Sequence, residues 1–296
     1  MTIASNARVL VTGSTGRVGR LVVDELLQAG VPVRALTRRP EVAGLPTDVE
    51  VVPGDLTVPD SLNRPLRDVA AVFLVWTAPP ATLAAIVERL ATARRRVVLL
   101  SSPHQTPHPF FQQPNPMAAL HAQIERRIAD AGIDATILRP GMFASNALGW
   151  WAASIRAGDV VRWPYGEVET APIDERDIAA VAARALCNER HAGRDYVLTG
   201  PQSLTQREQV NTIGDAIGRT IRFEELSPEE FRREMAATWP RVALDMLLAA
   251  WGAAVGRPAY MTSSVLDIVG SPPRTFREWA ADYAAAFQQA PAGVDA

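Results

Sequence analysis

The stretch that decides the fold is Val9-Leu10-Val11-Thr12-Gly13-Ser14-Thr15-Gly16-Arg17-Val18-Gly19-Arg20-Leu21-Val22. Apolar β-prone residues run into three glycines spaced G-x-x-G-x-x-G, and a helical pattern follows, which predicts a strand, a tight turn and a helix. Gly13 permits a positive φ or a close backbone approach. Gly16 leaves room for a pyrophosphate over main-chain N–H groups, and Gly19 lets the helix pack against the strand.

A glycine-rich turn without a ligand is the alternative, but the strand before the turn and the helix after it favour a dinucleotide site. The exposed amides and the positive end of the helix dipole suit phosphates. The residues of the turn expected to contact the cofactor are Gly13, Ser14, Thr15, Gly16, Arg17, Val18 and Gly19.

Composition narrows the class of protein. The 296 residues are 48% hydrophobic and 21% charged with a net charge of −2, which is typical of a globular enzyme and gives no electrostatic case for nucleic acid or a membrane surface. No apolar run approaches the roughly 20 residues of a membrane span, and residues 1–8 do not resemble a signal peptide. With one cysteine, Cys187, and no helical pair of histidines, we expect no disulfide, no metal and a cytoplasmic protein.

The residues after the second predicted strand, 31–37, indicate which dinucleotide binds. An NAD site places Asp or Glu there to accept from the ribose 2′-OH, whereas this chain has Arg38-Arg39. Guanidinium groups suit a 2′-phosphate, so NADPH/NADP+ is favoured, the alternative being a pair of solvated arginines. Asp55, in Gly54-Asp55-Leu56, is placed either to meet the adenine amino group or to form a turn.

Further strands at 49–52, 70–76, 96–100 and 135–138 alternate with helical patterns, which predicts a Rossmann-type α/β fold with a doubly wound parallel sheet. Such sheets bind ligands beyond the carboxyl ends of their strands. The additional cofactor contacts expected there are Leu56, Trp76, Thr77, Ser101, Pro140, Gly141 and Phe143. The substrate contacts expected nearby are His104, Phe143, Asn146, Trp150 and Trp151, although core packing is an equal alternative for the aromatic residues.

Two parts of the chain are expected to differ in role. Residues 1–144 read as an NADP(H)-binding Rossmann domain. Residues 145–296 read as a smaller mixed lobe that closes over the cofactor, supplies the substrate pocket and is interleaved with the sheet rather than independent. Helices are expected at 146–157, 174–187, 205–217, 228–237, 242–255 and 275–287, strands at 196–199 and 220–224, and a frayed tail at 291–296.

Several motifs together resemble the short-chain dehydrogenase/reductase superfamily, and its atypical NmrA-like branch in particular. They are Thr12-Gly13-Ser14-Thr15-Gly16-Arg17-Val18-Gly19, Gly54-Asp55-Leu56, Glu125-x13-Arg139-Pro140-Gly141-x-Phe143, Ala171-Pro172-Ile173-Asp174-x2-Asp177-Ile178-Ala179 and Leu198-Thr199-Gly200-Pro201. That branch includes quinone reductases, isoflavone-type reductases and cofactor-sensing regulators. The resemblance covers most of the chain and implies fold and cofactor more firmly than substrate.

The chain departs from the superfamily in its proton donor. The usual donor is a Tyr whose pKa is lowered by a Lys four residues later, with a Ser or Thr after the fifth strand. Aligning Glu125 with the family places His121 at the lysine position and Met117 at the tyrosine position, and puts the serine near Ser102 or Pro103. Because the chain contains no lysine, a Tyr-x-x-x-Lys donor is excluded whatever the alignment.

Two functions fit this pattern. The first is an NADPH-dependent reductase that transfers hydride to a ketone or quinone carbonyl of a planar, aromatic, polyketide-like small molecule, the proton coming from water, His121 or the substrate. His121 and Ser102 are the candidate catalytic residues, and antibiotic-pathway ketoreductases of the simocyclinone type are similar in lacking the Tyr-Lys pair. The second is a regulatory protein that senses NADP(H) without turnover. An epimerase or dehydratase is disfavoured because such reactions need a strong base. We expect a monomer or homodimer whose partner is a small molecule.

Overall fold

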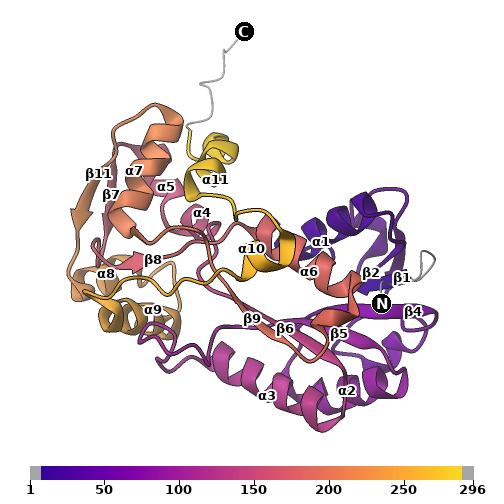
Figure 1. Cartoon of the computed structure of the whole chain (residues 1–296). Helices are drawn as coiled ribbons and strands as arrows, with labels where there is room; N and C mark the ends of the chain where they lie inside the picture. Colours follow the sequence, from indigo (N-terminus) through magenta and orange to yellow (C-terminus); the bar gives the residue numbers. More distant parts are fainter. Residues whose placement is uncertain (1–7, 289–296) are drawn as a thin grey trace.

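The computed structural model describes residues 8–288, and its centre is a seven-stranded sheet (Figure 1). The strands lie in the order β3-β2-β1-β4-β5-β6-β9, and every neighbouring pair is parallel. Their bounds are β1 (Arg8–Val11), β2 (Val33–Thr37), β3 (Glu50–Pro53), β4 (Val69–Val75), β5 (Arg96–Leu100), β6 (Ala135–Pro140) and β9 (Asp195–Leu198). The predicted Rossmann-type fold is confirmed. Successive strands are added on one side of β1 as far as β3 and on its other side from β4 onward, and such folds bind ligands at this change in strand order.

Helices cover both faces of the sheet, as Figure 1 shows. Val9 and Val11 pack under α1 (Arg17–Gln28), α6 (Glu175–Cys187) and α10 (Ser264–Val269), whereas Leu10 points to the face of α2 (Leu83–Thr92) and α3 (Pro116–Asp130). Successive strand side chains alternate between faces, so each β1 residue is buried whichever way it points. Short 3₁₀ turns complete the connections at η1 (Pro40–Val42), η2 (Pro59–Leu62), η3 (Pro80–Thr82), η4 (Glu189–His191) and η5 (Ala284–Ala286).

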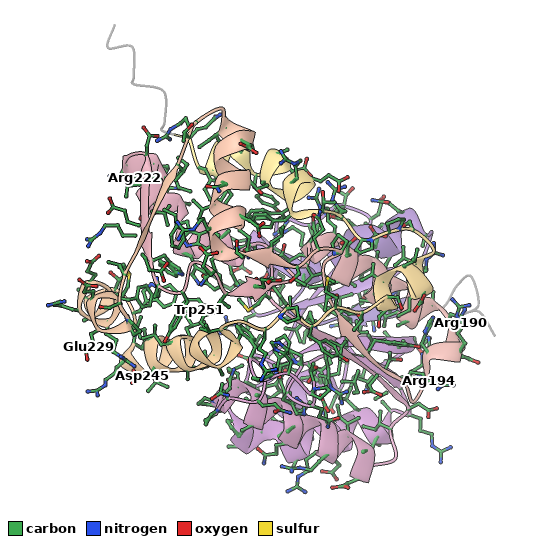
Figure 2. All side chains as sticks on the ribbon, turned by 60° about the vertical axis from the view of Figure 1, so that its left-hand side comes forward. Arg190, Arg194, Arg222, Glu229, Asp245 and Trp251 are labelled. Carbon is green, nitrogen blue, oxygen red and sulfur yellow. The ribbon has the colours of Figure 1, made fainter. Side chains whose placement is uncertain are left out.

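The second half of the chain builds a lobe with its own aromatic core. Figure 2 shows Trp251 inside this lobe and Glu229 at its outer edge. The lobe consists of α4 (Asn146–Trp150), α5 (Ala152–Ala157), β7 (Val160–Trp163), β8 (Glu169–Thr170), β10 (Leu204–Thr205), α7 (Gln206–Ile217), β11 (Arg222–Glu225), α8 (Pro228–Met235), α9 (Arg241–Ala254) and α11 (Phe276–Asp282). β7 pairs with β11 in parallel, and β8 pairs with β10 in antiparallel fashion.

Some element bounds differ from the sequence prediction. The helix expected at 146–157 is two helices, because the backbone of Trp151 (φ −121°) leaves the helical region between them. The connection between β3 and β4 contains only the 3₁₀ turn η2, and β7, β8, β10 and α10 were not predicted. The expected frayed tail at 291–296 lies outside the described residues, as does nearly all of segment 1–8.

β9 comes from the second half of the chain and yet forms the last strand of the central sheet, beside β6. The division at residue 144 therefore remains a prediction about roles rather than a physical boundary. Within residues 8–288, no helix combines the length and the apolar character that crossing a membrane would need.

Candidate functional site

The glycine turn between β1 and α1 is shaped by close backbone contacts. Gly13 has φ +60°, and a Cβ there would lie 3.0 Å from Val75 Cβ. A Cβ on Gly19 would lie only 2.1 Å from the Gly13 carbonyl oxygen, so α1 can approach the turn only because residue 19 has no side chain. The Gly16 N–H donates to Gly13 O (2.9 Å), and Ser14 Oγ donates to Leu36 O (3.0 Å), which ties the turn to β2. The turn is thus a rigid cradle at the start of a helix.

A cavity of about 250 Å³ opens above this cradle, at the carboxyl ends of β1 to β4. It contains predicted cofactor contacts from four separate segments, which the fold brings together. Its lining residues are Thr12, Gly13, Thr15, Gly16, Leu36, Thr37, Arg38, Gly54, Asp55, Leu56, Thr57, Val75 and Thr77. The other residues of the turn expected at the cofactor lie beside it, Ser14 buried beneath the turn, Arg17 exposed and Val18 in the core.

The two arginines after β2 differ in position. Both are exposed, but only Arg38 lines the cavity. No hydrogen bond or ion pair occupies either guanidinium among residues 8–288, so both remain available to an anion. Asp55 also lines the cavity, where its Oδ1 accepts from Thr57 N–H (2.8 Å) and Ser61 Oγ accepts from Asp55 N–H (2.9 Å). Asp55 therefore forms the turn that was the alternative for it, and it also lines the cavity.

Trp76, expected at the cofactor, is 6% exposed and belongs to the core under α2. Its Nε1 donates to Ala78 O (2.6 Å), and the neighbouring Thr77 is the residue that lines the cavity. The side chain of Trp76 thus anchors the loop after β4 to the hydrophobic core through its hydrogen bond to Ala78.

A second group of polar side chains lies at the carboxyl end of β5. Ser101 Oγ donates to Glu125 Oε1 of α3 (2.5 Å). Arg139, near the end of β6, donates from Nη2 to Glu125 Oε2 (2.8 Å) and from Nε to Oε1 (3.3 Å), and it also pairs with Asp195 of β9. Although burial opposes the charge, hydrogen bonds to Glu125 and Asp195 raise the pKa of Arg139. The carboxylate of Glu125 is therefore fixed by two strands.

The candidate catalytic residues surround Glu125. His121 lies one turn before it on α3, and His104 Nε2 is 3.6 Å from Glu125 Oε2. Ser102 Oγ, His104 Nε2 and His121 Nδ1 are buried and have no hydrogen-bond partner. Burial lowers the pKa of His121, an effect that Glu125 opposes and His104 reinforces. Buried polar atoms are normally paired, so the unpaired atoms of His104 and His121, both close to Glu125, indicate a site for a ligand.

The aromatic residues expected at the substrate are placed differently from one another. Trp151 is fully buried, and Trp150 packs edge-on against Trp151 (5.7 Å between ring centroids) and Trp251 (5.5 Å), so both belong to the core of the lobe. Phe143 is half-buried and bridges to Ile173. Asn146 is half-buried at the start of α4. Of the aromatic residues, Phe143 lies nearest in sequence to Pro140 and Gly141, which end β6.

A narrow cavity beside Gly141 contains residues that the sequence did not single out. It is lined by His108, Phe110, Phe111, Gly141, Met142, Glu169, Thr170, Ala171, Thr199, Ala259 and Tyr260. His108 is held by Pro258 O at its Nε2 (3.1 Å) and by Phe110 N–H at its Nδ1 (3.3 Å), which is a structural role. Phe110, Phe111 and Tyr260 come from irregular segments with no periodic pattern, so no sequence signal could have identified them. Over residues 8–288, no three His, Cys, Asp or Glu side chains are grouped as a metal site.

Comparison with known proteins gives matches along most of the chain. The sequence profile of the NAD(P)H-binding family matches residues 13–189. The (4-alkanoyl-5-oxo-2,5-dihydrofuran-3-yl)methyl phosphate reductase of Streptomyces griseus is 40% identical, over 94% of this chain and 99% of its own length. The NAD(P)H azoreductase of Xenophilus azovorans is 32% identical, over 94% and 99% respectively. The crystal structure of an NADPH-dependent quinone oxidoreductase from Escherichia coli has the same fold, with a TM-score of 0.78 at 23% identity, covering 93% of this chain and 98% of that one.

Proposed function

Because the chain belongs to the NAD(P)H-binding family, we propose that it is an NADPH-dependent reductase that transfers hydride to a ketone or quinone carbonyl of a planar, aromatic, polyketide-like small molecule. The observation that carries the proposal is the combination of an intact dinucleotide cradle with unpaired polar atoms at the end of β5. Relatives along nearly the whole chain are named as reductases that act on a dihydrofuranone phosphate and, with NAD(P)H, on azo compounds. Bound NADPH supplies the hydride, and the protein positions it.

The residues present fit NADPH. Gly16 and Gly19 keep the space over the start of α1 free, since side chains there would press on Gly13 O (3.1 and 2.1 Å from the added Cβ). In our proposal the main-chain N–H groups of this turn bind the pyrophosphate, and Arg38 with Arg39 binds the 2′-phosphate. In our proposal Ser102 and His121 also bind the reacting end of the cofactor, which would supply partners for their buried, unpaired atoms.

The missing Tyr-Lys pair restricts the acceptor. Met117, at the position of the tyrosine, is half-exposed and has no acidic hydrogen. An acceptor that stabilises its own negative charge after hydride addition needs less help from an acid. Quinones have this property, as do azo compounds and alkenes that carry two carbonyl groups. Positioning alone then contributes much of the rate, because a bound hydride donor and acceptor react as one complex.

The aromatic lining beside Gly141 supports a planar acceptor. Phe110, Phe111 and Tyr260 line this narrow cavity of about 10 Å³, and our proposal requires these side chains to move apart for a flat conjugated molecule to bind between them. We place the reaction among the tailoring steps of antibiotic biosynthesis in the cytoplasm, carried out by a monomer or homodimer. The relative from Streptomyces griseus, a reductase of a small oxygenated ring, is consistent with a tailoring role.

The test is oxidation of NADPH, followed at 340 nm, with a panel of quinones, polycyclic aromatic ketones and alkenes bearing two carbonyl groups. We expect turnover with at least one of these classes and a much smaller rate with NADH. An NADP(H)-sensing regulator is the second candidate, because the Tyr-Lys pair is absent. Tight and unequal binding of NADPH and NADP+ without turnover on any acceptor would support the regulator and refute the reductase.

A further inference from the structure

We propose that His104 is the proton donor of the reduction and that Glu125 is the positioning residue that prepares it, an assignment that rests on the proposed reductase function. The two residues come from different elements. His104 lies in the loop after β5, and Glu125 lies on α3, where Ser101 and Arg139 hold its carboxylate.

The starting observation is a concentration of unpaired atoms. Twelve buried side-chain N or O atoms of the described chain have no hydrogen-bond partner, and four of them belong to the segment 102–121. These four atoms are Ser102 Oγ, His104 Nε2, Thr106 Oγ1 and His121 Nδ1. An unpaired buried polar group costs about 1–3 kcal/mol, so their accumulation is best explained by a ligand that pairs with them.

The orientation of the His104 ring fixes its hydrogen positions. Nδ1 is 3.0 Å from the Ser102 carbonyl oxygen, which can only accept, so Nδ1 carries a hydrogen. In the neutral ring Nε2 then presents a lone pair to the Glu125 carboxylate, 3.6 Å away, and two acceptors face each other. The charged ring instead presents an N–H to that carboxylate. We therefore assign Nε2 of His104 as the atom that donates the proton.

The same distance leaves the proton available. At 3.6 Å, Nε2 is too far from Glu125 Oε2 for a full hydrogen bond, so the N–H remains free to donate to a ligand oxygen. Glu125 cannot move toward His104 without breaking its contacts with Ser101 and with both donating nitrogens of Arg139. The carboxylate thus attracts the proton to this ring without capturing it.

His121 is unsuited to share this role. Burial lowers its pKa, Glu125 only partly offsets the effect, and the neighbouring charge of His104 lowers the pKa further. Two imidazolium rings beside one carboxylate would repel each other, so we assign the donor role to His104 alone. His121 stays neutral and serves as a hydrogen-bonding partner of the bound ligand through Nδ1.

The proposed step balances as follows. The carbonyl carbon of the acceptor gains a hydride from bound NADPH, and the electron pair of the C=O π bond moves to oxygen. That oxygen takes the proton from His104 Nε2, and the electrons of the broken N–H bond stay on nitrogen. The products are an alcohol, NADP+ and neutral His104, which water then reprotonates.

The experiment measures the same variants with two acceptors, which differ in how much the anion formed by hydride addition needs an acid. A simple aryl ketone yields a strongly basic alkoxide and needs the acid, whereas an alkene with two carbonyl groups yields a stabilised enolate and does not. We expect His104→Ala to lower kcat on the ketone by about 100-fold or more and on the alkene by less than about 5-fold, with an unchanged Kd for NADPH. Glu125→Gln is also expected to lower kcat more on the ketone than on the alkene, but by a smaller factor than His104→Ala, with KM unchanged. His191→Ala is the matched control, since that histidine contacts Arg190 and Tyr196 and lines neither the cofactor cavity nor the cavity beside Gly141.

Equal losses on both acceptors, or no loss on the ketone, would overturn the assignment. A purely structural role of His104 would lower both rates together and weaken cofactor binding. If a variant fails to fold, the wild-type protein still gives an answer: we expect a solvent deuterium isotope effect on kcat with the ketone and none with the alkene, and the reverse or equality refutes the proposal. A wild-type protein that oxidises NADPH with no quinone, ketone or alkene of the panel would instead refute the reductase function, and the assignment with it.

Discussion

Replacing Arg38 by alanine should separate binding of the 2′-phosphate from binding of the rest of the cofactor. Arg38 lines the cavity over the glycine turn, and no acidic residue of the described chain pairs with it. The substitution therefore removes a charge without breaking an internal contact, and folding stability should be unchanged. Surface substitutions of this kind usually alter the free energy of unfolding by less than about 0.5 kcal/mol.

The magnitude follows from exposure. Because the Arg38 side chain is exposed, water screens it, and two unit charges about 4 Å apart then interact by about 1 kcal/mol. A 2′-phosphate carries close to two negative charges, so the loss is about 2 kcal/mol, which corresponds to roughly a 30-fold increase in the Kd of NADPH. NADH has no 2′-phosphate, so its Kd should change by less than about 3-fold.

The assay is fluorescence titration of NADPH and NADH at low salt, where exposed charges are least screened. Arg39→Ala is a second variant for comparison: Arg39 is exposed next to Arg38 but does not line the cavity, so its loss should weaken NADPH binding less than the loss of Arg38. Equal weakening of NADPH and NADH by Arg38→Ala would show that the arginine does not contact the 2′-phosphate.

Three further predictions concern folding and the cofactor cradle. Gly19→Ala places a Cβ 2.1 Å from Gly13 O, so it should lower the free energy of unfolding in urea by about 1–3 kcal/mol and abolish NADPH binding in a fluorescence titration. Gly149→Ala, with no atom within 4 Å of the added Cβ, should change neither quantity. Normal NADPH binding by Gly19→Ala would contradict the role of the glycine turn. Trp151→Ala should lower the free energy of unfolding by about 3–5 kcal/mol, and a smaller loss than about 1 kcal/mol would argue against its core position. Burial raises the pKa of Asp177 to about 6. Between about pH 4 and 6 the native protein therefore binds a proton on this group that the unfolded chain does not bind. The contribution of Asp177 to the free energy of unfolding thus falls as the pH rises through that window. Asp177→Asn should therefore stabilise the protein by up to about 3 kcal/mol at pH 8 and progressively less toward pH 4, as followed by urea unfolding; an equal gain at both pH values would exclude this cause.

The cofactor half of the site could be predicted because its signals are local. The spacing of Gly13, Gly16 and Gly19 is dictated by contacts within a single turn, and Arg38 follows a strand whose end the hydrophobic pattern already marks. Parallel strands then bring their carboxyl ends together by topology alone. Membership of the NAD(P)H-binding family confirms the resemblance on which the fold and cofactor were also predicted.

The substrate half could not be predicted because it depends on packing between distant segments. Trp150 and Trp151 are adjacent aromatic residues in the sequence, and nothing local distinguishes a pocket wall from the core of a lobe that also contains Trp251. Tyr260 reaches the cavity beside Gly141 from a segment without regular structure. The pairing of β7 with β11 likewise joins strands about 60 residues apart, which periodicity does not reveal.

The surroundings of Glu125 could be predicted in part from the sequence. The sequence marked it by its spacing to Arg139, and the structure gives that spacing a physical meaning, since the two side chains meet between α3 and β6. What the sequence lacked was the approach of His104 to the same carboxylate, because that loop contains several prolines and follows no regular pattern.

The most direct test of the account is the fate of the hydride. NADPH that carries deuterium at the transferring C4 position should be incubated with the protein and a polycyclic aromatic ketone, and the product analysed by mass spectrometry. We predict one deuterium bound to carbon in the product and stoichiometric NADP+. A protein that binds NADPH and yet leaves both the cofactor and the acceptor unchanged, or a product whose new carbon-bound hydrogen comes from water alone, would contradict hydride transfer as its function.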